Sequence, residues 1–93
     1  MRQIKLVGRE LAVVRAIEST GSTGAYLQER TGIEPLDLLD VLNALFETGY
    51  IEAYVDGCQV ATMDPLVMDQ LDAARFEINP AYYLELKKVI QHR

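Results

Sequence analysis

With 93 residues, 49% of them hydrophobic and 25% charged, the chain has the composition of one small globular domain and not of a disordered segment. A net charge of −5 disfavours non-specific binding to nucleic acid or to anionic membranes. No apolar run approaches the ~20 residues that span a bilayer, which predicts no membrane partner, and the one cysteine cannot form an internal disulfide, so we expect a cytoplasmic protein.

The first half of the chain is predicted to form three helices. Apolar residues at helical spacing predict the first helix from about Arg9 to Ser19. Ser22 or Thr23 can cap a short second helix over residues 24–30. The third helix is predicted to begin at Pro35, whose missing N–H is not needed in a first turn, and to end at Thr48-Gly49.

The second half alternates between predicted strands and short helices. Turn residues, helix caps and alternating apolar positions define their limits. In chain order these are a strand over Tyr50–Val55, a turn at Asp56-Gly57, a returning strand over Cys58–Thr62, a short helix from Asp64-Pro65 to about Ala74, a strand over Arg75–Asn79, and a last helix capped by Asn79-Pro80 that reaches about Gln91.

Four local patterns carry a resemblance to a known family. They are the tight turn Thr31-Gly32-Ile33, the shared helical face of Leu38, Leu42 and Leu45, the strand start Gly49-Tyr50-Ile51, and Asn79-Pro80 before the last helix.

In these patterns, residues 8–91 resemble the winged helix-turn-helix superfamily of small bacterial and archaeal regulators. The resemblance implies one domain over residues 1–93 with a mainly α (α+β) fold. Its parts would be a three-helix core, a small antiparallel β-wing with an elongated insertion, and a C-terminal helix. The usual role that it implies is transcription regulation.

The charge of the third helix departs from that family. Between Arg30 and Arg75 there is no Lys or Arg, whereas nine acidic residues lie there. Proteins gain most of their non-specific DNA affinity by neutralising phosphates, so this helix would be repelled. We therefore predict a regulatory or adaptor protein that binds a protein partner, or itself, through an acidic and leucine-rich surface that includes the long wing. The predicted partner-binding residues are Leu36, Asp37, Leu39, Asp40 and Asn43.

The last helix has a broad apolar side. Terminal helices of winged-helix regulators often pair across a two-fold axis, so the resemblance implies a homodimer. The other interpretation is that this side packs against the first helix. The residues concerned are Tyr82, Leu86, Val89 and Ile90.

Two other functions remain open. The first is a DNA-binding transcriptional regulator that turns its acidic helix away and uses cations in the N-terminal and C-terminal parts of the chain; the second is a structural subunit of a larger complex. For the first, the predicted DNA contacts are Arg2, Lys5, Arg9, Arg15, Arg30 and Arg75.

The segment between the wing strands is longer than a hairpin loop. Met63, Val67 and Leu71 fall at i, i+4 and i+8, so this segment either contacts a partner or folds over its own core.

The sequence predicts no enzyme, cofactor or metal site. Cys58 and His92 are the only residues of their types, and the spacing of Asp64, Asp69 and Asp72 does not follow a calcium loop. Residues 21–24 are interpreted as a helix cap rather than a phosphate cradle.

Overall fold

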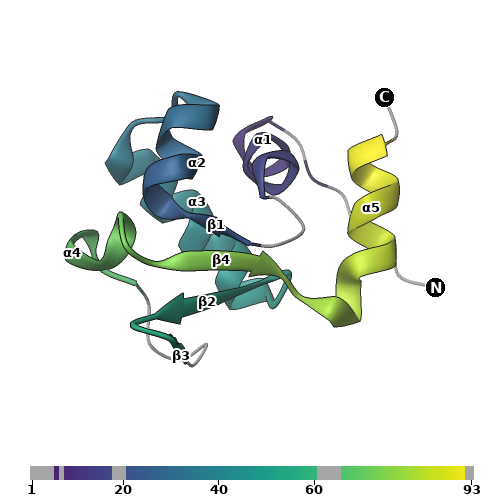
Figure 1. Ribbon diagram of the computed structural model, residues 1–93. Helices are drawn as coiled ribbons and strands as arrows, with labels where there is room; N and C mark the ends of the chain where they lie inside the picture. The colour runs from purple at the N-terminus through teal and green to yellow at the C-terminus, as the bar shows by residue number, and fades with distance from the viewer. Residues whose placement is uncertain (1–5, 7, 18–20, 61–65, 92–93) are drawn as a thin grey trace.

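In the computed structural model, a four-stranded antiparallel sheet lies beside a group of helices, with one further helix at the end of the molecule (Figure 1). The structure describes residue 6 and residues 8–17, 21–60 and 66–91, and of residues 89–91 only the backbone. The elements are α1 (Gly8–Ala16), β1 (Ser22–Thr23), α2 (Gly24–Thr31), α3 (Pro35–Thr48), β2 (Ile51–Val55), β3 (Cys58–Gln59), α4 (Met68–Leu71), β4 (Arg75–Ile78), the 3₁₀ turn η1 (Pro80–Tyr82) and α5 (Tyr83–Gln91).

The helical half confirms the predicted elements. Helix α3 has the predicted bounds, and α2 extends one residue further than predicted, to Thr31. Helix α1 ends at Ala16, before the predicted Ser19, and residues 18–20 lie outside the described residues. The buried residues of α3 include the predicted Leu38, Leu42 and Leu45, which share one face of the helix.

The predicted helix ends are confirmed in their chemistry. The Thr23 hydroxyl accepts a hydrogen bond from the backbone N–H of Tyr26 at 3.1 Å, and so caps α2. Gly32 and Gly49 follow α2 and α3 in the left-handed conformation, with φ of 70° and 88°, where a side chain would be strained.

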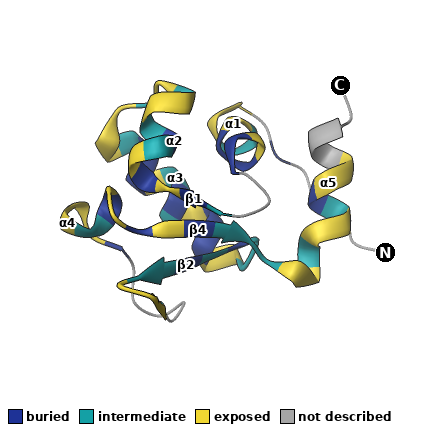
Figure 2. Ribbon diagram, viewed as in Figure 1, coloured by how far each residue is buried: buried dark blue, intermediate teal, exposed yellow. Residues whose placement is uncertain are grey.

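The strand order in the sheet is β1-β4-β2-β3, so the last strand in sequence lies between the first two. Strand β1 was not predicted, because its two residues carry no alternating pattern and pair only with the distant β4. Ala53 and Phe76 are cross-strand partners and are fully buried, so they mark the inner face of the sheet. Figure 2 shows buried positions on the strands and on the helices beside them. On the outer face, Tyr54 pairs with Arg75.

The segment between β2 and β4 differs most from its prediction. The turn at Asp56-Gly57 is confirmed by positive φ at both residues, 52° and 79°. Among the described residues the returning strand is β3, and residues 61–62 of its predicted range, like Asp64-Pro65, predicted to open a helix, lie outside the described residues. Helix α4 begins at Met68, and Leu66, two positions before it, exchanges two hydrogen bonds with Asn43 of α3.

Helix α5 stands at the end of the molecule beside α1 (Figure 1). The predicted Asn79 cap is confirmed, since its side chain accepts from the N–H of Ala81 at 3.0 Å. Leu86 is fully buried, and the ring of Tyr82 meets that of Tyr50 edge to face with centroids 5.1 Å apart.

We predict that Gly24→Ala destabilises the fold, because an added Cβ would lie 1.8 Å from the carbonyl oxygen of Leu71. This close approach joins the start of α2 to the end of α4, where Gly24 N–H also donates to Ala74 O at 2.9 Å. Urea denaturation should show a loss of unfolding free energy of about 1–3 kcal/mol or more. Ala25→Ser, at the exposed next position, should change it by less than about 0.5 kcal/mol; equal effects of the two substitutions would contradict the prediction.

Candidate interaction surface

Large hydrophobic side chains that the described residues leave exposed gather at two places. Leu36 is 66% exposed at the start of α3, and Val67 and Met68 are 54% and 42% exposed at α4. Tyr83 and Leu84, 46% and 69% exposed, lie together on α5. Single exposed hydrophobic residues need no explanation, but groups beside charges of one sign are typical of interaction sites.

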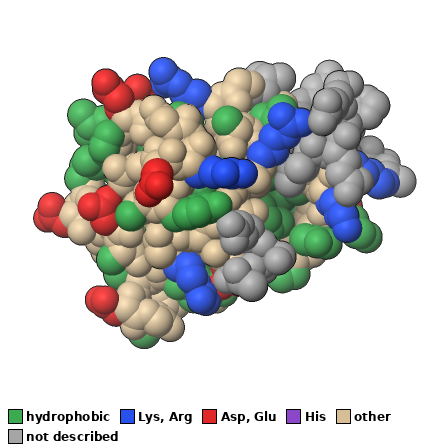
Figure 3. All heavy atoms as spheres, turned by 45° about the horizontal axis from the view of Figure 1, so that its top comes forward, with side chains coloured by type: hydrophobic (Ala, Val, Ile, Leu, Met, Phe, Trp, Pro, Cys, Tyr) green, Lys and Arg blue, Asp and Glu red, His purple; other side chains and the backbone are tan. Residues whose placement is uncertain are grey.

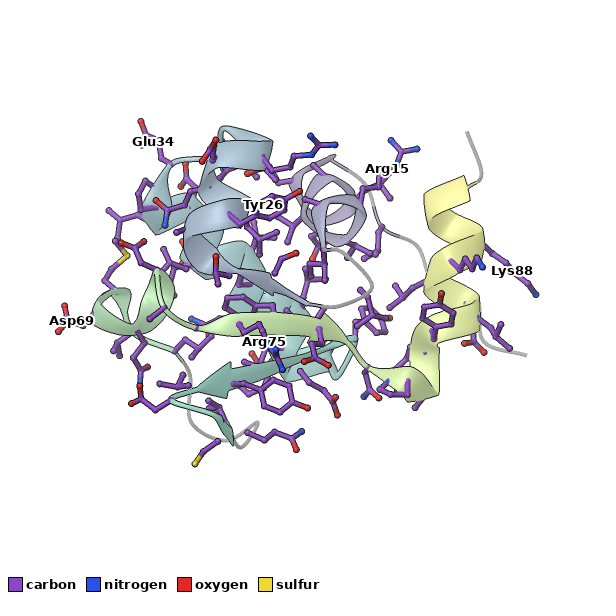
Figure 4. All side chains as sticks on the ribbon, viewed as in Figure 1. Arg15, Tyr26, Glu34, Asp69, Arg75 and Lys88 are labelled. Atoms are coloured by element: carbon purple, nitrogen blue, oxygen red, sulfur yellow. The ribbon has the colours of Figure 1, made fainter. Side chains whose placement is uncertain are left out.

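The first group forms a surface that we call the acidic face. Helix α3 contacts α4, and hydrophobic and acidic side chains gather at this end of the molecule (Figure 3). Glu34 and Asp69 both point outward on this side, from the residue before α3 and from α4 (Figure 4). Glu34, the residue before α3, lies next to the acidic face and is not counted in it. The acidic face consists of Leu36, Asp40, Val67, Met68 and Asp69.

Asn43 joins the two parts of this surface. Its Nδ2 donates to the Leu66 carbonyl at 3.1 Å, and its Oδ1 accepts from the Leu66 N–H at 2.9 Å. Leu36, Asp40 and Asn43 follow one another at i, i+4 and i+7, so they share a face of α3. The two hydrogen bonds therefore hold Val67 and Met68 beside the stripe that carries Leu36 and Asp40.

The predicted partner-binding residues differ in how far the domain covers them. Leu36 and Asp40 are exposed, and Asp37 is partly exposed and pairs with Arg9 at 3.4 Å. Leu39 is only 9% exposed and belongs to the core, because α3 needs a wider apolar side than one stripe to cover its neighbours. Leu39 was thus wrongly placed on a surface, and the amide of Asn43 is engaged within the chain.

The second group lies on α5 and is called here the lysine face. It consists of Tyr83, Leu84, Lys87 and Lys88. Residues 83 and 87, like 84 and 88, are four apart and therefore adjacent on the helix surface. The Lys87 ammonium lies 5.7 Å from the centroid of the Tyr83 ring, a cation–π distance.

The predicted dimerisation residues lie in η1, on another side of α5, or outside the described side chains. Leu86 is buried within the chain, where α5 contacts α1, and Tyr82 is half-buried against Tyr50. Both side chains pack within the chain, Leu86 where the other interpretation placed this side, next to the first helix, and Tyr82 against Tyr50 instead. The side chains of Val89 and Ile90 are outside the described residues. The exposed apolar residues of α5 are Tyr83, which lies next to the predicted side, and Leu84, and neither was among the predicted dimerisation residues, because sequence spacing alone does not say which side of a helix the domain covers.

The cations predicted as DNA contacts are dispersed. Arg2 and Lys5 are outside the described residues, and Arg15 and Arg30 are exposed on α1 and α2. Arg9 and Arg75 each face a carboxylate.

The outer face of the sheet is a network of hydrogen bonds and charges. Arg75 pairs with Glu77 at 2.7 Å and lies 5.6 Å from the Tyr54 ring centroid. Glu52 accepts from Tyr54 at 3.4 Å and from Gln59 at 3.2 Å. Desolvation, followed by the charges of Glu52 and Glu77, raises the pKa of the Tyr54 phenol. This network occupies the polar groups of the face with one another.

No group of three or more His, Cys, Asp or Glu side chains suited to a metal ion occurs among the residues that the structure describes. Within the same residues, no helix has both the length and the apolar character required to cross a bilayer.

No protein-family model matches the chain, and neither the curated proteins nor the solved structures gave a match.

We predict that Asn43→Ala loosens the connection between α3 and α4. Loss of both hydrogen bonds to Leu66 should reduce the unfolding free energy by about 1–3 kcal/mol. Amide hydrogen exchange at Leu66 should accelerate more than at Leu27, which is buried in α2. Ala44→Ser, at an exposed position of the same helix, serves as the control. Unchanged exchange at Leu66 would contradict the role given to Asn43.

We also predict that Glu52→Gln lowers the pKa of Tyr54 toward its ordinary value of about 10, since one of the negative charges that raise it is removed. Because the folded pKa is raised, the stability that neutral Tyr54 contributes is complete below the unfolded pKa and is lost as pH rises through the folded pKa. An NMR titration of the Tyr54 ring, assigned with Tyr54→Phe, measures the shift. A pKa that Glu52→Gln leaves in place would exclude Glu52 as a cause.

Proposed function

We propose that this protein is a small winged-helix-like interaction domain whose acidic face binds a partner protein. The observation that carries the proposal is the placement of Leu36, Val67 and Met68, all exposed, beside the carboxylates of Asp40 and Asp69. A complementary partner would present apolar side chains flanked by Lys or Arg. As a regulatory or adaptor protein it would act in the cytoplasm, where the exposed thiol of Cys58 stays reduced.

The order of elements supports a winged-helix-like fold. Three helices precede the strands β2 and β4, which pair antiparallel, and a further helix follows them. The turn between α2 and α3 contains Gly32 in the left-handed conformation. In such a fold α3 is the helix that faces a partner, and here the exposed start of α3 contributes to the acidic face.

The charge of that helix favours protein over DNA as the partner. Its exposed residues include Leu36, Asp40 and Glu47, and α3 has no cation. Carboxylates repel phosphates, and the pairing of Arg9 with Asp37 reduces the positive charge nearest to the helix. An apolar surface bordered by carboxylates instead suits a basic amphipathic segment.

The test is binding of a synthetic amphipathic peptide with leucines on one side and lysines beside them, followed by fluorescence anisotropy. We expect saturable binding to the full chain that weakens between about 50 mM and about 200 mM salt. Asp40→Lys should weaken it about five- to tenfold, because an attractive charge becomes a repulsive one. Glu47→Lys makes the same charge change on the same side of α3, about 10 Å further along the helix and beyond the residues of the acidic face, so it should weaken binding much less.

Two results would overturn the proposal. One is peptide binding that Asp40→Lys and Glu47→Lys weaken equally, since general charge would then explain it. The other is tight, salt-sensitive binding of random-sequence duplex DNA with no binding of the peptide, which would favour a DNA-binding regulator.

A further inference from the structure

The chain itself carries a surface with the properties that the acidic face requires. All five of the large hydrophobic side chains that the described residues expose lie on the acidic face or the lysine face. One group has Asp40 and Asp69 beside it, and the other has Lys87 and Lys88. The two surfaces therefore match in apolar character and are opposite in charge.

We propose that the acidic face of one copy docks against the lysine face of a second copy. This inference rests on the proposed function, because it names the partner of the same acidic face. In the contact, Tyr83 and Leu84 of one copy would cover the exposed Leu36, Val67 and Met68 of the other. The lysines would lie near the carboxylates of Asp40 and Asp69, an arrangement that gives specificity and orientation.

The positions of the two faces determine what kind of assembly forms. Helix α4 and the start of α3 lie at one end of the molecule and α5 at the other (Figure 1), and the longest extent is 36 Å. A copy that uses one face thus keeps its other face open. Such a head-to-tail contact is heterologous and continues into chains or a ring, unlike a two-fold dimer.

Charge explains why this contact is selective. Each copy carries a net charge of −5, so two copies repel one another in most orientations. The lysine face is the region of α5 where two adjacent cations accompany exposed apolar side chains. Few side chains take part on each side, so the contact is small. The fraction of associated copies should therefore depend on protein concentration.

The first experiment is sedimentation velocity of the full chain over a concentration series. We expect species larger than a dimer to increase with concentration. Leu36→Asn on the acidic face and Leu84→Asn on the lysine face should each weaken association about tenfold, because each removes an apolar side chain from the contact. Both residues are more than half exposed, and neither substitution alters the net charge or removes a core side chain.

Mixing the two variants gives the sharper result. Leu36→Asn retains the lysine face, and Leu84→Asn retains the acidic face. The mixture should therefore form one-to-one dimers at concentrations where each variant alone is monomeric, and should not form larger species. Ala12→Asn, at an exposed position of α1 outside both faces, should associate like the unaltered chain.

Three outcomes would overturn this proposal: a chain that is monomeric at every concentration, a dimer that Leu36→Asn leaves intact, or a mixture of the variants that does not associate. The second outcome would indicate a two-fold contact through α5. The peptide experiment separates this failure from that of the proposed function. Peptide binding lost in Asp40→Lys but retained in Glu47→Lys, with a monomeric chain, leaves the acidic face as a site for another protein.

Discussion

The paired hydrogen bonds between Asn43 and Leu66 are the constraint on which the surface of this domain depends. They hold the segment before α4 against the middle of α3, although the two residues are 23 positions apart. Leu66 and Leu71 are thereby buried on either side of Val67 and Met68, which stay exposed. Gly24 holds the other end of this segment in place, because only a residue without a Cβ lets the start of α2 lie against the end of α4. Residues 66–71 thus contribute Leu66 and Leu71 to the core and Val67 and Met68 to the surface.

The two groups of exposed apolar side chains, with charges of opposite sign beside them, lie at different ends of the molecule. The acidic face combines residues from α3 and α4, and the lysine face comes from α5 alone. Between them the polar side of the sheet, with Arg75, Glu77 and Tyr54, forms its own internal network. The proposed functions follow from this division, since apolar surface supplies affinity and the flanking charges supply orientation.

Much of the local structure could be predicted from the sequence. Pro35 and Gly49 delimit α3, Thr23 and Gly32 delimit α2, and Asn79 begins the last helical segment, because capping and left-handed turns depend on neighbouring residues only. Strand β1 could not be predicted, since its two residues become a strand only by pairing with β4, more than fifty positions later. Within the described residues, α4 is shorter than the helix predicted from Asp64-Pro65 to about Ala74, and Leu66 is hydrogen-bonded to Asn43 of α3.

The candidate site shows the same division between local and distant causes. The sequence by itself determined that α3 is acidic and rich in leucine, that the chain has no cation between Arg30 and Arg75, and that α5 has apolar residues on more than one side. Only the tertiary structure decided that Leu39 and Leu86 are core residues, that Asn43 is engaged with Leu66, and that Leu36, Val67, Met68, Tyr83 and Leu84 are exposed. The physical reason is that charge and helical spacing are properties of a segment, whereas burial depends on which distant segment covers it.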